Sequence, residues 1–310
     1  MTTDVLPQLG DEVFLTDGGI ETDLIYRRGI DIPEFASFVL HDDPEAEPVV
    51  RDYFRDYLRT SAETGHGLVL ETLTWRASAD WGHTLGYNAA RLREANQRAV
   101  AFLLDLRDQE AESPVVVSGC VGPRGDAYSD LGSMDGDAAE EYHRIQVAVL
   151  AAAGVDLVSA LTLTNVAEAV GVARAARACS IPAVISFTVE TDGALPDGTS
   201  LAAAIAAVDE ATEGAPAYYM VNCAHPDHFA AVLAGSDPSL GRVRGVRANA
   251  SRKSHAELDE SEELDDGDPT EFGSQLAALH RSQPHINVLG GCCGTDHRHI
   301  EAIANEFHPS

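Results

Sequence analysis

The sequence has few cysteines and no long apolar run. Its five cysteines among 310 residues are an odd number at irregular spacing, which excludes a regular disulfide framework and favours reduced thiols. No apolar run is long enough to span a bilayer, and the N-terminal residues lack the basic and apolar regions of a signal peptide. We therefore expect a cytoplasmic protein with no membrane partner.

Positive charge is also scarce. Lys253 is the only lysine, and 21 Lys and Arg residues face 50 Asp and Glu residues, which gives a net charge of −29. A surface this acidic keeps a protein soluble and repels phosphate backbones, so a nucleic-acid partner is excluded as well.

Short apolar runs alternate with amphipathic stretches, and the alternation repeats eight times along the chain. Several runs are continuously apolar, as in parallel strands that are buried on both faces. The predicted strands are Val13–Thr16, Gly67–Thr72, Val115–Gly119, Asp156–Leu161, Ala183–Thr188, Ala217–Asn222, Val243–Arg247 and Ile286–Gly290.

The stretches between these runs have helical periodicity. The predicted helices are Val49–Thr64, Ala89–Gln109, Ala138–Ala153, Val166–Ala178, Leu201–Ala211 and Phe272–Ser282. Eight β-then-α units predict a (β/α)8 TIM barrel that occupies residues 1–310 as one domain. A doubly wound sheet is the alternative, but no G-x-G-x-x-G motif follows the first strand.

Two segments interrupt the alternation, and both follow predicted strands. His255–Pro269 is acidic and rich in turn formers, and Gly122–Asp137 is rich in Gly and Asp. We expect both to be loops over the C-terminal mouth of the barrel, where enzymes with this fold keep their active sites.

Three cysteines follow predicted strands and should therefore meet at this mouth. Cys223 follows the sixth strand in "YYMVNCAHPDH", while Cys292 and Cys293 follow the eighth in "NVLGGCCGT". Three thiolates with one open position are typical of a catalytic zinc site, and the glycines around the pair allow both sulfurs to reach one ion. The alternative is that these thiols are inert.

The remaining cysteines and two nearby histidines have simpler interpretations. Cys120 and Cys179 are predicted to be small packing residues, because an isolated cysteine is most often buried as a hydrophobe. His225 and His228 lie close enough to Cys223 to compete as ligands, but we expect them to cap a helix or face water.

A zinc ion with three thiolate ligands is a poor catalyst for hydrolysis because it is electron-rich. It can bind a fourth thiol and lower the pKa of that thiol, so that a thiolate nucleophile exists at neutral pH. This chemistry suits alkyl transfer to a thiol substrate.

These motifs resemble the homocysteine S-methyltransferase family over nearly the whole chain. "LTDGGIETDL" (Leu15–Leu24) is similar to the motif of the family's first strand, "VNC" (Val221–Cys223) to its first zinc ligand, and "GGCCGTDHRHI" to its paired-cysteine signature. The resemblance implies a zinc-binding barrel with Cys223, Cys292 and Cys293 as ligands. It also implies that Asp17, with the backbone of Gly18 and Gly19, helps to hold a substrate ammonium group; a simple chain reversal is the alternative for this turn.

The fourth predicted strand departs from the family pattern. The family usually has a Glu at the strand's end that binds the substrate ammonium, and the matching residue in "DLVSALTLTNVAEA" is Leu161. Losing a charge-assisted hydrogen bond costs about 1.5–3 kcal/mol. Glu71, at the end of the second strand, and Glu190, after the fifth, are carboxylates at the same mouth, and each could instead be a solvent-facing acid. We predict that Glu71 supplies the second carboxylate. Thr162 and Asn249 are predicted to line the pocket.

The leading hypothesis from the sequence is a zinc-dependent enzyme that transfers a methyl group to homocysteine or a related thiol. The donor would be a small molecule such as S-methylmethionine, S-adenosylmethionine or betaine. One alternative, motivated by Leu161, is a zinc barrel that binds a thiol amino acid without turnover. Another is redox chemistry at Cys292 and Cys293 without a metal. The sequence leaves open whether the chain forms a homo-oligomer.

Overall fold

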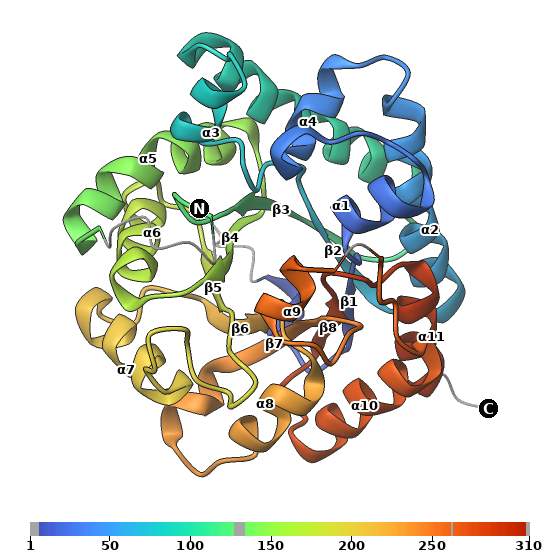
Figure 1. Cartoon of the computed structure of the whole chain (residues 1–310), viewed down its shortest axis with the longest axis vertical. Helices are drawn as coiled ribbons and strands as arrows, with labels where there is room; N and C mark the ends of the chain where they lie inside the picture. The colour runs from blue at the N-terminus through green and yellow to red at the C-terminus, as the bar shows by residue number, and fades with distance from the viewer. Residues whose placement is uncertain (1–5, 127–133, 262, 308–310) are drawn as a thin grey trace.

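The computed structural model describes residues 6–126, 134–261 and 263–307, and its strands form one closed barrel (Figure 1). Each strand pairs in parallel with the next one in the chain, and the eighth closes onto the first. The strands are β1 (Phe14–Thr16), β2 (Gly67–Glu71), β3 (Val115–Val121), β4 (Leu157–Leu163), β5 (Ala183–Phe187), β6 (Tyr218–Asn222), β7 (Val243–Ala248) and β8 (Val288–Gly291).

Most of the helices form a ring around the outside of the barrel, whereas α9 (His255–Asp259) lies over one of its ends (Figure 1). They are α1 (Ile20–Thr22), α2 (Glu47–Thr64), α3 (Ala79–Thr84), α4 (Ala89–Glu110), α5 (Gly136–Ala153), α6 (Val166–Ala178), α7 (Leu201–Thr212), α8 (Pro226–Leu233), α9 (His255–Asp259), α10 (Pro269–Ser282) and α11 (His297–Phe307). Shorter helical turns are η1 (Pro7–Leu9), η2 (Asp23–Arg27), η3 (Pro33–Phe35), η4 (Ser37–Asp42) and η5 (Pro238–Arg242).

The predicted fold class, a (β/α)8 barrel, is confirmed. Almost every strand residue is buried, since helices cover the outside and side chains fill the inside. None of the helices in the described residues combines the length and apolarity that a membrane crossing requires.

The strand boundaries differ from the prediction by one or two residues. The largest functional consequence is in β4, which continues to Leu163, so Leu161 lies inside the strand rather than at its end. A register shift between Ala160 and Leu163 marks an irregularity at this point, and Thr162 has a left-handed backbone with φ of 65°.

The predicted loop His255–Pro269 is not entirely a loop, because it begins with α9. Ser254 caps this helix through a capping box with Glu257, a local signal that outweighs the turn-rich composition. The other predicted loop, Gly122–Asp137, lies partly outside the described residues, since 127–133 are not among them.

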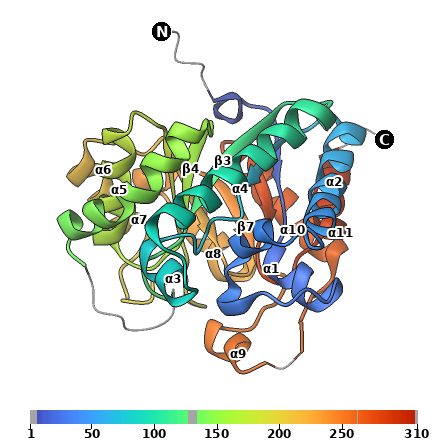
Figure 2. The ribbon, with the colours of Figure 1, turned by 90° about the horizontal axis from the view of Figure 1, so that it is seen from above.

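The two ends of the barrel are covered differently. At the N-terminal end, the side-chain amide of Asn287 donates hydrogen bonds to the carbonyls of Gln8, Gly10 and Glu12 and so holds the first turn in place. In Figure 2 this turn and α9 lie on opposite sides of the barrel. The C-terminal mouth is therefore the side on which α9 projects.

Candidate metal centre and substrate pocket

The three predicted ligand cysteines come together at the C-terminal mouth. Their Sγ atoms all lie within 4.8 Å of one another, and those of Cys223 and Cys293 are 3.6 Å apart. Sulfurs at about 2.3 Å from a tetrahedral zinc ion are separated by about 3.8 Å, so the spacing and the donor set fit this metal. No second group of His, Cys, Asp and Glu ligand atoms this close occurs in the residues that the structure describes.

Backbone hydrogen bonds fix the two segments that carry these cysteines. We call Gly291–Thr295 the paired-cysteine loop. Its Cys292 amide donates to the carbonyl of Ala248 at the end of β7 (2.7 Å), and the amide of Ala250 donates to the Cys293 carbonyl (3.1 Å). Cys223 has a φ of 58°, a conformation that non-glycine residues rarely adopt and that recurs at functional sites.

The cluster favours negative charge on Cys292. Thiol hydrogen bonds from Cys223 and Cys293 lower the pKa of Cys292, and the positive charge of Arg247 acts in the same direction. The same thiol hydrogen bonds raise the pKa of Cys293, which keeps its proton to donate, and burial and the repulsion between neighbouring thiolates raise it further. A cation at this point would remove that repulsion and stabilise all three thiolates.

The other cysteines and the two histidines lie outside the cluster. Cys120 is buried in β3 and Cys179 is half-buried at the end of α6, consistent with packing roles. His225 caps α8 by accepting a hydrogen bond from the Asp227 amide (3.1 Å), and His228 contacts the carbonyl of Arg252 (3.1 Å). The prediction that such histidines cap a helix is confirmed for His225.

His255 contacts the cluster from α9, and sequence reasoning did not identify it. Its Nε2 lies 2.6 Å from the carbonyl oxygen of Cys223, and its Nδ1 lies 3.5 Å from the carboxylate of Glu190. Glu190, predicted at the mouth, is thus part of a chain of contacts that reaches the Cys223 backbone, rather than an isolated acid. The only signal in the sequence was a histidine in an otherwise acidic segment.

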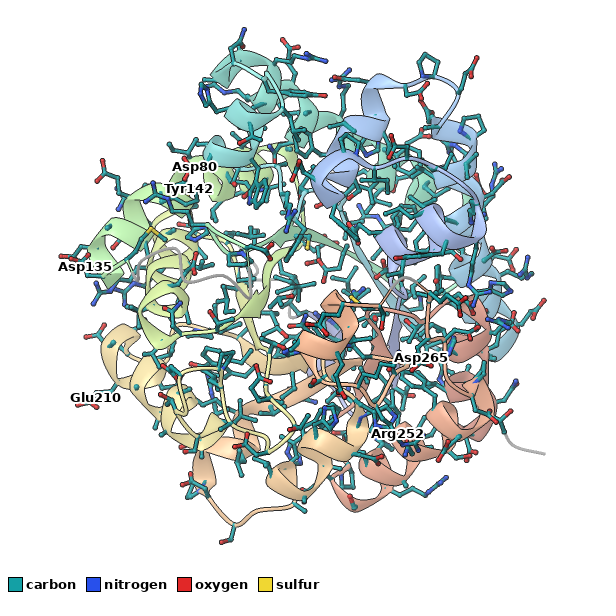
Figure 3. All side chains as sticks on the ribbon, in the orientation of Figure 1. Asp80, Asp135, Tyr142, Glu210, Arg252 and Asp265 are labelled. Atoms are coloured by element: carbon teal, nitrogen blue, oxygen red, sulfur yellow. The ribbon has the colours of Figure 1, made fainter. Side chains whose placement is uncertain are left out.

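The rest of this segment also packs on the cluster. Ser251 donates a hydrogen bond to Asp265 (2.6 Å), and a Cβ on Gly294 would come within 2.7 Å of the Asp265 carbonyl oxygen. Figure 3 shows Asp265 and Arg252 on the β7–α10 connection, whereas Asp135 and Glu210 lie at the outer rim. The acidic segment therefore covers the mouth, as its position after β7 predicted.

A buried arginine occupies the centre of the predicted ammonium site. Arg247 donates to the carboxylate of Asp17 (2.7 Å) and to the carbonyl of Gly18 (3.2 Å), and it lies 3.9 Å from Glu71. Burial opposes its charge, but Asp17 and Glu71 raise the pKa of Arg247. Two of the groups that the family resemblance assigns to a substrate ammonium are therefore already engaged by a cation of the chain itself.

Glu71 is buried beneath the mouth and is 6% exposed. Burial raises its pKa to about 7, although the charge of Arg247 opposes the shift. Asp17 shows the same balance, since burial raises its pKa against the opposing effect of Arg247. Sequence reasoning did not identify Arg247. The available signal was its position as a charged residue in a strand that is mostly buried.

The predicted pocket residues in β4 and directly after β7 are buried. The side chain of Asn222 bonds both the amide and the hydroxyl of Thr162 (2.8 Å each), so the residue before Cys223 is held to β4. Leu161 is 7% exposed, and its carbonyl accepts a hydrogen bond from the Trp75 indole (3.3 Å). The side-chain oxygen of Asn249 is buried without a hydrogen-bond partner in the described residues.

Comparison with known proteins identifies the family. The family description "Homocysteine S-methyltransferase" matches residues 14–307. The chain belongs to the homocysteine S-methyltransferase family. It is therefore a methyltransferase, and the resemblance inferred from the cysteine motifs is confirmed.

Individual relatives are distant but cover most of the chain. Homocysteine S-methyltransferase 2 of Zea mays is 23% identical over 95% of this chain and 89% of its own length, and the Escherichia coli homocysteine S-methyltransferase is 28% identical over 61% of this chain and 63% of its own length. Selenocysteine Se-methyltransferase of Brassica oleracea is 23% identical over 93% of this chain and 87% of its own length.

The fold is shared with a solved structure. The metallated form of the homocysteine methyltransferase MmuM from Escherichia coli superposes with a TM-score of 0.74 at 22% identity and covers 96% of both chains.

Proposed function

We propose that this methyltransferase transfers a methyl group from a small donor to the thiol of homocysteine or a closely related thiol. The observation that carries the proposal is the cluster of three thiols at the mouth of the barrel, with Sγ atoms spaced for one tetrahedral ion. The names of its relatives and the family match support the same acceptor.

We further propose that Cys223, Cys292 and Cys293 hold Zn²⁺. All three present thiol ligands, and a tetrahedral ion held by three thiolates keeps a fourth position for a substrate. When bound, the ion supplies a Lewis acid that lowers the pKa of a substrate thiol. His255 would orient the site through its contact with the Cys223 carbonyl.

The transfer itself requires alignment rather than acid–base catalysis. The acceptor thiol releases its proton to the solvent, and its sulfur attacks the donor's methyl carbon from the side opposite the leaving group. A new carbon–sulfur bond forms, while the electron pair of the broken bond stays on the donor's sulfur or nitrogen. The products are a thioether and the demethylated donor, and the protein contributes by holding the two reactants in line.

The substrate pocket is proposed to include the residues around this cluster. They are Asp17, Gly18, Gly19, Glu71, Thr162 and Asn249. The side-chain oxygen of Asn249 has no hydrogen-bond partner among the described residues, and this supports a polar contact with a ligand, since a buried oxygen without a partner costs free energy.

A matrix of donors and acceptors tests this function. Zinc-loaded protein would be incubated with S-methylmethionine, S-adenosylmethionine or betaine, each with homocysteine, cysteine or 4-mercaptobutanoate, and thioethers quantified by mass spectrometry. We expect methylation of homocysteine by at least one donor, its loss in Cys292→Ala and its retention in Cys179→Ala. Binding of homocysteine without any product would instead support the binding-protein alternative.

A further inference from the structure

Glu21 lies on α1, which packs directly against the paired-cysteine loop. The backbone amide of Gly19 donates to the carbonyl of Thr295 (3.1 Å) on one side. On the other side, the amide of Gly294 donates to the hydroxyl of Thr22 (3.1 Å). Glu21 lies between these two contacts, so its position relative to the metal ligands is fixed by the backbone.

The Glu21 carboxylate is held in place and lies within electrostatic reach of the cluster. The buried hydroxyl of Ser37 donates a hydrogen bond to it (2.8 Å). Burial raises the pKa of Glu21, and the negative charges of Cys292 and Asp17 raise it further.

Glu21 differs from the other mouth carboxylates in its ion pairs. Asp17 and Glu71 have Arg247 within 4.0 Å, and Glu190 has His255. In the part of the chain that the structure describes, no Arg, Lys or His forms such a pair with Glu21.

Arg76 lies within electrostatic reach of Glu21. Its guanidinium carbon, however, lies 3.9 Å from the centre of the Trp81 ring, and the guanidinium lies 3.5 Å from Asp126. Glu21 thus has no directly paired cation among the described residues, and its carboxylate can pair with a cationic group of a ligand.

We propose that Glu21 binds the α-ammonium group of the acceptor, the role that the family pattern gives to the position of Leu161. This assignment rests on the proposed function. Asp17 is less suited to the role, because an ammonium group beside it would also lie close to the Arg247 guanidinium, which is 2.7 Å away from that carboxylate. Glu21 is thus a specificity-determining residue that selects thiol amino acids over thiols without an amino group.

Equilibrium binding separates this role from turnover. The probes are methionine, which is the thioether expected from homocysteine, and 4-(methylthio)butanoate, which lacks only the amino group. Calorimetry on zinc-loaded protein should show that Glu21→Gln weakens methionine binding about tenfold or more, or about 1.4 kcal/mol, and leaves the analogue unchanged. Asp31→Asn is the matched control, since it also replaces an acid with its amide but at an exposed position between β1 and α2. It should change the affinity for neither methionine nor the analogue.

Additional variants exclude indirect effects. Glu21→Asp keeps the charge and should retain a preference for methionine, and zinc content should equal that of the parent in both Glu21 variants. In turnover assays, Glu21→Gln should raise the KM for homocysteine and leave the KM for the donor unchanged.

Several results would overturn the assignment. One is an equal loss of affinity for both probes in Glu21→Gln, and another is a parent protein that does not bind methionine more tightly than the analogue. A change in the KM for the donor alone would also overturn it. So would a loss of affinity for methionine, but not for the analogue, in Glu71→Gln instead of Glu21→Gln. The last result would support the prediction made for Glu71 from the sequence. Amino-dependent binding through Glu21 in a protein that methylates no thiol would uphold this assignment and refute the proposed function.

Discussion

Replacing Glu71 with Gln should make the stability of the barrel less dependent on pH. Burial raises the pKa of Glu71 from 4.5 to about 7, so the folded chain binds this proton more tightly than the unfolded chain does. The free energy of unfolding of the parent therefore falls as pH rises from 4.5 to about 7 and then levels off. Glutamine is neutral at every pH in this range, so the free energy of unfolding of Glu71→Gln lacks this decline.

The pKa shift sets the size of the effect. Each pKa unit corresponds to about 1.4 kcal/mol, so between about pH 5.5 and pH 8 the variant should gain about 2 kcal/mol relative to the parent. Urea unfolding followed by circular dichroism at both pH values measures this difference. Glu45→Gln, at an exposed position, is the control and should show no relative change. An equal pH dependence in Glu71→Gln and the parent would show that Glu71 is ionised in the folded barrel at neutral pH.

Three further predictions concern the buried charges and the cysteines. Arg247→Met should destabilise the fold by about 3–5 kcal/mol because it leaves its carboxylate partner buried and unpaired, and chemical unfolding measures the loss. Cys120→Ala and Cys179→Ala should keep the parental zinc content and turnover, since both thiols lie outside the cluster; zinc loss from either would contradict this. Gly19→Ala should reduce zinc affinity about tenfold in a chelator competition, because its Cβ would collide with the Cys292 carbonyl and displace the paired-cysteine loop, whereas unchanged affinity would show that the loop adapts.

The barrel was predictable because its strands are short apolar runs of similar length separated by amphipathic helices. The same rule placed the cysteines at one end, since the ends of parallel strands converge. Helix α8 was missed, although Pro226 at its first turn and the capping residue His225 were available as signals.

The contacts inside the pocket could not be predicted in the same way. Arg247 lies in a strand, but nothing in its local pattern shows that its guanidinium reaches Asp17, which is 230 positions away in sequence. Glu21 is near the cluster because α1 packs on a loop from the other end of the chain. The position of Leu161 was misjudged because the strand continues through an irregularity that has no clear sequence signal.

Zinc content is the most direct measure of the central claim. Elemental analysis of the purified protein should give about one zinc per parent chain and a large loss in Cys223→Ala, Cys292→Ala and Cys293→Ala, with each variant still folded by circular dichroism. Full zinc occupancy in the Cys293→Ala protein would contradict the proposed metal site.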